Sequence, residues 1–167
     1  MPKRNAALDT SFWINAFEAG ITEFLSDYFN LFVCQAVVEE VMYPVDVLGL
    51  LSDGAALFNT WLQAGCITRQ ESARAIDWFD RGENYAAALA LERGYHLLVD
   101  DAYAYHFARS RGVSVIATPE FIVWLYRDGR LGYDEARAAL KQIQIEKKQR
   151  RVGLVALRLL AQRRGEE

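Results

Sequence analysis

Short apolar runs alternate with longer segments of helical pattern along most of the chain. The runs cover residues 5–8, 31–34, 95–99 and 113–117, and segments with apolar side chains at helical spacing stand between them. Strands that are covered by helices on both faces of a parallel sheet are apolar throughout, so this alternation predicts βαβ units. We therefore expect an α/β fold, a three-layer α/β/α sandwich around a mostly parallel central sheet.

Capping and helix-breaking residues predict where the helices begin and end. Thr10 and Ser11 can cap the first helix, Pro44 ends the second, and Gly112 ends a later one. Residues 65–68 are typical of a connector or an edge strand. Between the strands we expect helices over residues 36–42, 52–63, 71–79, 84–93 and 102–111, and after the last strand over 120–126, 133–145 and 148–162.

The composition indicates a globular protein. Hydrophobic residues make up 52% of the 167 positions and charged residues 25%, which allows a substantial core and is not typical of a disordered chain. No apolar run approaches the roughly 18 residues that span a bilayer, and no apolar leader follows the basic start, so we expect a cytoplasmic protein without membrane contact. Cys34 and Cys66 lack metal-like spacing, which predicts reduced, buried thiols.

Charge is distributed unevenly along the chain. The net charge is −3, yet residues 141–167 carry eight basic and three acidic residues, so an acidic body precedes a basic tail. Basic residues in a helix can bind RNA phosphates. The tail can equally be a solvated helix whose apolar face packs on the domain or on a second subunit. The candidate RNA-binding residues are Lys147, Lys148, Arg150 and Arg151.

Acidic residues follow the apolar runs. Four separate segments place them at or near the ends of the predicted strands: Asp9, Glu39 with Glu40, Glu83, and Asp100 with Asp101. Ligands of open parallel sheets bind beyond the carboxyl ends of the strands, where the strand order reverses. Clustered carboxylates repel one another unless a cation neutralises them, and hard oxygen ligands favour Mg²⁺ or Mn²⁺. Such an ion can activate water and stabilise charge on a phosphoryl group, which suits phosphodiester hydrolysis.

Each acid also has a purely structural interpretation. Asp9, and either Asp100 or Asp101, can cap the helix that follows it, and Glu83 can close a capping box. The acids of residues 36–42 can be a solvated helix face. Only the joint placement of these acids at one end of the sheet favours a metal site.

Three parts of the sequence together resemble the PIN-domain family. The segment Leu8-Asp-Thr-Ser-Phe-Trp-Ile14 resembles the family's opening strand, acid and hydroxyl residues, and Ala36-Val-Val-Glu-Glu-Val41 resembles its second acidic segment. The stretch from Gly82-Glu through Leu97-Leu-Val-Asp-Asp101 to Gly112-Val-Ser-Val-Ile-Ala-Thr118 is similar to the VapC-type branch, which is related to bacterial and archaeal toxin nucleases. The order and spacing of these segments carry the resemblance.

The resemblance implies a metal-dependent ribonuclease, with Mg²⁺ or Mn²⁺ held by acids, that is the toxin half of a toxin–antitoxin pair. The catalytic acids then correspond to Asp9, Glu40, Glu83 and Asp101, with Asp100 as a further metal ligand. The hydroxyl groups that would orient these carboxylates belong to Thr10, Ser11 and Thr118. The implied partners are RNA, an antitoxin protein and a second copy of the chain. We expect a PIN-like domain over residues 1–130 and a basic helical extension over 131–167.

Two departures separate the chain from this branch. Tyr105 stands where an arginine is usual after the acidic pair, with Arg109 as the nearest replacement, and Pro119 stands in a segment that is usually rich in glycine. These departures motivate an alternative hypothesis, a catalytically inactive PIN-like module that binds RNA or a protein. A phospho-acceptor receiver domain also carries acids at strand ends, but the chain lacks a well-placed lysine after the last strand.

Overall fold

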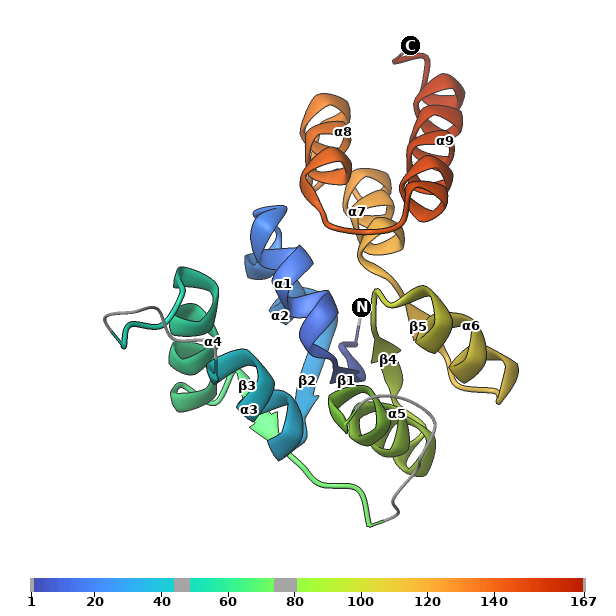
Figure 1. Ribbon diagram of the computed structural model, residues 1–167. Helices are drawn as coiled ribbons and strands as arrows, with labels where there is room; N and C mark the ends of the chain where they lie inside the picture. Colours follow the sequence, from blue (N-terminus) through green and yellow to red (C-terminus); the bar gives the residue numbers. More distant parts are fainter. Residues whose placement is uncertain (1, 44–48, 74–80, 167) are drawn as a thin grey trace.

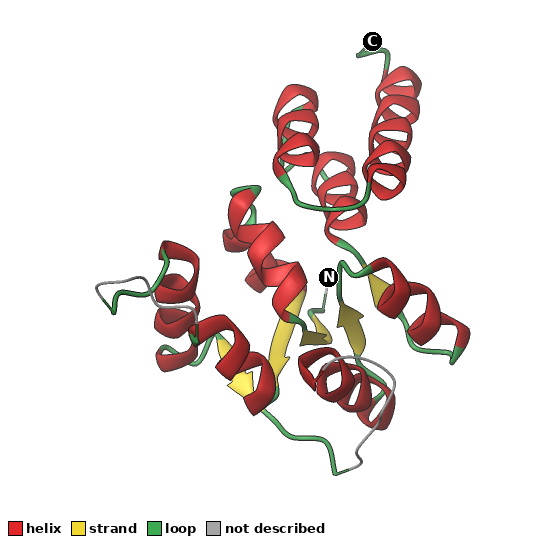
Figure 2. Cartoon of the chain, in the orientation of Figure 1, coloured by secondary structure: helices red, strands yellow, loops and turns green. Residues whose placement is uncertain are grey.

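A parallel sheet forms the centre of the computed structural model, which describes residues 2–43, 49–73 and 81–166. Five strands pair in parallel in the order β3-β2-β1-β4-β5, and helices pack around them (Figure 2). The expected α/β class and α/β/α sandwich are confirmed. The strands are β1 (Arg4–Leu8), β2 (Phe29–Val33), β3 (Ile67–Arg69), β4 (His96–Leu98) and β5 (Val115–Ile116). The helices are α1 (Thr10–Glu18), α2 (Thr22–Tyr28), α3 (Gln35–Met42), α4 (Asp53–Gln63), α5 (Arg81–Arg93), α6 (Ala102–Ser110), α7 (Thr118–Arg127), α8 (Tyr133–Gln142) and α9 (Lys147–Arg164).

The strand order reverses between β1 and β4. From β1 the chain adds β2 and then β3 toward one edge, and it returns to place β4 and β5 on the other side of β1 (Figure 1). The amide of Asp9 donates a hydrogen bond of 3.0 Å to the carbonyl of Leu98, which ties the ends of the two strands together. The carboxyl ends of β1 and β4 therefore flank the position where sheets of this kind bind ligands.

An aromatic cluster joins helices to the sheet beneath this position. Phe121 of α7 is fully buried, and its ring centroid lies 6.3 Å from that of Phe12, 5.3 Å from that of Tyr28 and 5.6 Å from that of Phe29. Phe12 follows Asp9 by three residues, and Phe121 follows Thr118 by three. The packing of this cluster consequently fixes the two helices whose first residues border the carboxyl ends of β1 and β5.

The last three helices pack on one another, and α7 and α8 also pack on α1 (Figure 1). Leu140, Leu157 and Ala161 are buried in the same core as the sheet. Gly153 lets α9 approach closely, because a Cβ atom there would lie 2.9 Å from Leu140 Cδ2 and 3.1 Å from Pro119 Cβ. The boundary expected at residue 130 falls between α7 and α8, and both helices beyond it pack against α7.

Two helix ends depart from expectation for identifiable reasons. Helix α7 begins at Thr118 rather than at 120, because Pro119 in its first turn is compatible with a helix start. Helix α8 ends at Gln142 rather than at 145, because Ile143 is extended and the amide of Gln144 donates a hydrogen bond of 2.7 Å to Asn15 Oδ1. A tertiary contact therefore ends α8 although the apolar pattern continues.

Other expectations have mixed outcomes. Residues 65–68 lead into an edge strand, β3, and α2 has no counterpart among the expected helices. The first residues of the helix expected over 71–79 are not helical, and 74–80 lie outside the described residues, as does Pro44. Cys34 is buried, but the prediction of a buried Cys66 is wrong, because it lies in the exposed bend between α4 and β3. No helix in the described part of the chain is long and apolar enough to cross a membrane.

Candidate active site

Asp9 is a buried carboxylate directly after β1. Only 2% of its surface is exposed, and its Oδ2 caps α1 by accepting hydrogen bonds from the amide (2.9 Å) and hydroxyl (2.6 Å) of Ser11. Of the three residues that the sequence offers as caps for this helix, Asp9 is the one that caps it, and Thr10 and Ser11 lie within the helix. Its Oδ1 is buried without a hydrogen-bond partner in the described structure. Burial raises the pKa of Asp9 to about 6, and the negative charge of Glu40 adds to this effect.

Asp100 is a second buried carboxylate, two residues after β4. Its Oδ2 accepts hydrogen bonds of 2.6 Å from Asn15 Nδ2 and from Thr118 Oγ1, and its Oδ1 accepts one of 2.6 Å from the Thr118 amide. Burial raises the pKa of Asp100 to about 6 although these hydrogen bonds lower it, and the charge of Asp9 raises it further. Asp9 and Asp100 therefore form an electrostatically coupled pair at the point where the strand order reverses.

Three polar side chains hold this pair in place. Ser11 contacts both acids, since its hydroxyl donates to Asp9 Oδ2 and accepts a hydrogen bond of 3.0 Å from the Asp100 amide. Thr118 and Asn15 are themselves buried and donate to Asp100. Asn15 is absent from the residues that the sequence predicts for the site. Its one available signal is a polar residue on the apolar, inward face of α1.

Glu40 lies further out than the buried pair. It is exposed on α3, and its Oε2 accepts a hydrogen bond of 2.8 Å from Thr10 Oγ1. Thr10 follows Asp9 directly, so this contact attaches α3 to the start of α1. Glu40 affects Asp9 through its charge, which raises the pKa of Asp9.

Glu83 and Asp101 line the same cavity as Asp100. This cavity has a volume of about 630 Å³, and Ser11 and Asn15 also line it. Glu83 is half-buried near the start of α5. Asp101 is exposed and caps α6, because its Oδ1 accepts a hydrogen bond of 2.7 Å from the Ala104 amide. The structure thus brings Asp9 together with Asp100, and it places Asp101 nearer to solvent.

The donor set fits a divalent ion that keeps much of its water. Within residues 2–43, 49–73 and 81–166, no three side chains of His, Cys, Asp or Glu are grouped closely enough to hold a metal. Mg²⁺ commonly binds through one or two carboxylates and retains several water molecules. The buried, unpartnered Oδ1 of Asp9 can serve as an oxygen ligand, and a bound cation would oppose the effect of burial that raises the pKa values of Asp9 and Asp100.

The start of α9 borders the acidic site. Gln149 Nε2 donates a hydrogen bond of 3.2 Å to the carbonyl of Asp100. Of the basic residues expected to contact RNA, Arg150 donates to the carbonyl of Ile143 at 2.7 Å and is half-buried. The other three are exposed: Lys147, Lys148 and Arg151.

Tyr105 joins α6 to α7 beside the site. Its hydroxyl donates a hydrogen bond of 2.6 Å to Glu120 Oε1 and accepts one of 2.9 Å from Arg109 Nη1. Tyr105 is buried, so this position contributes packing and a hydrogen-bond network. The guanidinium of Arg109 thus contacts Tyr105 within the same helix.

The stability of the metal-free chain is expected to decrease as pH rises. The pKa of Asp9 is about 6 in the folded chain and 3.8 in the unfolded chain, so the folded chain binds more protons between these values and loses stability as pH increases. Asp9→Asn does not titrate, so its free energy of unfolding should gain up to roughly 3 kcal/mol relative to wild type between about pH 4 and pH 7. Urea unfolding in chelator over this range measures the difference, and a difference that does not change with pH would contradict the assignment.

The comparisons with known proteins agree with this geometry. No curated protein matches the chain. The family described as PIN domain matches residues 6–163, which include the last three residues of β1, all of β2 to β5, α8 and nearly all of α9. PIN domains are generally nucleases and typically use divalent metal ions. Because the match covers most of the sequence and the fold agrees with it, the chain belongs to the PIN-domain family.

Proposed function

We propose that the chain is a metal-dependent endoribonuclease that hydrolyses phosphodiester bonds of RNA. The observation that carries this proposal is the buried pair of Asp9 and Asp100, with one carboxylate oxygen unpartnered, at the point where the strand order reverses. Membership of the PIN-domain family, whose members are generally nucleases, supports this proposal. The same membership excludes the interpretation as a receiver domain.

Asp9 and Asp100 would hold the ion, which we assign as Mg²⁺ or Mn²⁺ because all the nearby donors are hard oxygens. When bound, such an ion activates water and stabilises charge on the phosphoryl group. Ser11, Asn15 and Thr118 keep the two carboxylates oriented through their hydrogen bonds.

The other acids surround this pair. Glu83 and Asp101 line the cavity beside Asp100, and their negative charges would favour cation binding there. Glu40 adds negative charge that favours cation binding at Asp9. Of the two neighbouring acids Asp100 and Asp101, the geometry favours Asp100 as the metal ligand, whereas the resemblance to the family motif favours Asp101.

RNA is the proposed substrate, and exposed cations of α9 are placed to hold it. Lys147, Lys148 and Arg151 are exposed on the helix that contacts Asp100 through Gln149. A row of cations beside an acidic site can hold the phosphates that flank the cleaved bond. We extend the proposal to a toxin role, with an antitoxin protein and a second copy of the chain as partners.

An RNA cleavage assay tests the proposal. We expect the purified chain to cleave single-stranded or structured RNA internally with Mg²⁺ or Mn²⁺, and cleavage to stop in excess chelator and return when the metal is restored. Cleavage that persists in chelator would contradict a metal-dependent mechanism.

A second candidate is a PIN-like module that binds RNA without cleaving it. The lack of a three-residue metal group among the described residues favours this candidate, as does Tyr105 in place of a cation. Binding of RNA to the metal-loaded chain, with the RNA remaining intact, would select it.

A further inference from the structure

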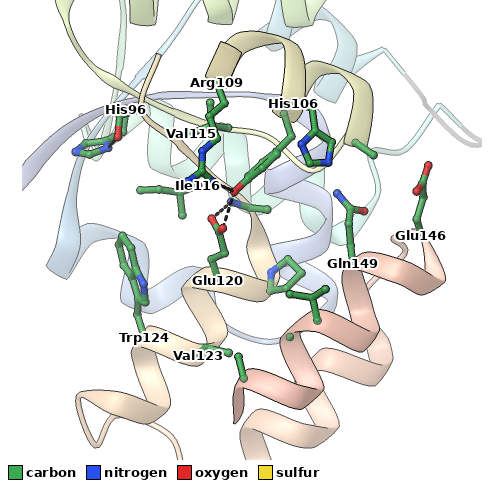
Figure 3. Close-up of a pocket in the computed structure, with 18 of the residues that line it drawn as sticks. His96, His106, Arg109, Val115, Ile116, Glu120, Val123, Trp124, Glu146 and Gln149 are labelled. Carbon is green, nitrogen blue, oxygen red and sulfur yellow. Dashed lines mark hydrogen bonds between the residues drawn. The ribbon is translucent and has the colours of Figure 1, made fainter. Parts of the chain in front are cut away.

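A second cavity lies beside the acidic site, between α6, β5, α7 and α9. Its volume is about 840 Å³, within the range of about 300–1,000 Å³ that is common for ligand pockets. Figure 3 shows Val115 and Ile116 of the edge strand on one side, Val123 and Trp124 of α7 below them, and Gln149 rising from α9 toward α6. Apolar walls with a few polar groups are typical of sites that bind small molecules.

The two cavities adjoin and share part of their lining. Ala102, Glu146 and Gln149 line both of them. Ala102 follows Asp101 directly, and Gln149 contacts the main chain of Asp100. A polynucleotide that presents one phosphate to the acids can therefore extend its neighbouring nucleoside into the second cavity.

The charges of this cavity suit an anionic ligand. Among the described residues that line it, the cations are Arg4, Arg109 and Lys148, and the acids are Glu120 and Glu146. The carboxylate of Glu120 already accepts hydrogen bonds from Tyr105 (2.6 Å) and from the Ala117 amide (3.1 Å). Three cations against two acids give these side chains a formal net charge of +1, which favours an anionic ligand such as phosphate.

Gln149 offers an acceptor at the junction of the two cavities. Its Nε2 donates to the carbonyl of Asp100, while its Oε1 is buried without a hydrogen-bond partner in the described structure. A buried acceptor without a donor is costly, and a ligand that supplies the donor relieves that cost. The 2′-hydroxyl of a ribose and the N–H groups of nucleobases are such donors.

We propose that this second cavity binds the nucleoside next to the phosphate that is cleaved. The base lies between the apolar walls, Gln149 Oε1 accepts a hydrogen bond from the ribose or the base, and Lys148 attracts the adjacent phosphate. This inference rests on the proposed nuclease function, because the acids define which phosphate is cleaved. It assigns to the cavity the recognition of the nucleotide that flanks the cut.

The histidines allow a test that reports on this cavity alone. The chain contains only two, His96 and His106, and both line it. NMR signals of the two imidazole rings are recorded on the full chain, without divalent metal, during titration with each of the four ribonucleoside 5′-monophosphates. We expect saturable shifts with at least one nucleotide and much smaller shifts with inorganic phosphate.

Two matched pairs of surface variants complete the test. Val152 lines the cavity and is 63% exposed, whereas Val155 is 50% exposed on the same helix and does not line it. Val152→Glu should weaken nucleotide binding about five-fold or more, because it adds a negative charge to the wall, and Val155→Glu should leave it within about two-fold. Lys148→Gln, which removes a lining cation, and Lys141→Gln, which removes an exposed cation of α8 outside the lining, should show the same contrast.

The outcomes separate this inference from the nuclease proposal. Unmoved imidazole signals, or equal shifts with phosphate alone, would overturn the nucleoside site even if the chain cleaves RNA. Equal losses in both members of a variant pair would overturn it as well. Saturable nucleotide binding with the expected contrast supports the cavity as a nucleotide site, even if the chain proves unable to cleave RNA.

Discussion

Asp100→Asn is expected to reduce metal-dependent RNA cleavage about 100-fold or more, which corresponds to at least about 2.7 kcal/mol of transition-state stabilisation. The substitution keeps the size of the side chain but removes a charge that neutralises the ion. Asn15 and Thr118 donate hydrogen bonds to the carboxylate of Asp100. The amide of asparagine has only one oxygen to accept them, so the substitution also weakens this network. Asp9→Asn should cause a loss of similar size, because Asp9 supplies the unpartnered oxygen.

Asp101→Asn is the matched control. Asp101 is exposed and caps α6, and asparagine is an equally good capping residue, so the fold is preserved. We expect cleavage to fall less than about five-fold, since solvent screens an exposed charge. Cleavage rates of the three variants, with circular dichroism to verify folding, make the comparison. If Asp100→Asn stays active and Asp101→Asn loses all activity, Asp101 rather than Asp100 is the acid that cleavage requires.

Phe121→Ala is expected to lower the free energy of unfolding by about 3–5 kcal/mol, because truncating a fully buried aromatic ring removes apolar contacts and leaves a cavity. The ring contacts Phe12, Tyr28 and Phe29, so the loss loosens α7 against α1 and the sheet. Thr118 begins α7, so its hydrogen bonds to Asp100 should also weaken.

Urea unfolding of the metal-free chain measures this effect, with Leu159→Ala as the control. Leu159 is 52% exposed on α9, and its truncation should change the free energy of unfolding by less than about 0.5 kcal/mol. A loss below about 1 kcal/mol for Phe121→Ala would show that the aromatic cluster does not hold α7 in place.

The sheet could be predicted from the sequence because buried parallel strands are apolar throughout. Residues 5–8 and 95–99 contain the cores of β1 and β4, and the acid after each strand is visible as the first charge that interrupts the run. Parallel pairing then brings Asp9 and Asp100 to the same edge of the sheet. Both the fold and the location of the candidate site follow from this local pattern.

The choice between Asp100 and Asp101 could not be made in this way. Successive side chains at a strand end point in different directions, and the sequence does not define the last strand residue closely enough to tell which acid points inward. In the structure, contacts from Asn15 and Thr118 distinguish them, and these residues are far from Asp100 in the sequence.

The contact between α9 and the candidate site could not be predicted from the local sequence pattern either. Gln149 stands among four basic residues, and nothing in its neighbourhood distinguishes it from a solvated polar side chain. Its contact with Asp100 depends on the packing of α9 against α7 and α8, which Gly153 permits. Residues that reach a site through tertiary packing leave no periodic signal in the sequence.

In the proposed active site, Asp9 and Asp100 together bind a divalent ion. Isothermal titration calorimetry with Mn²⁺ and then Mg²⁺, on the wild type and on Asp9→Asn, Asp100→Asn and Asp101→Asn, tests this binding most directly. We expect saturable binding to the wild type and to Asp101→Asn, and no detectable binding to the other two variants. Absence of binding to the wild type, or unchanged binding to Asp9→Asn and Asp100→Asn, would contradict the claim.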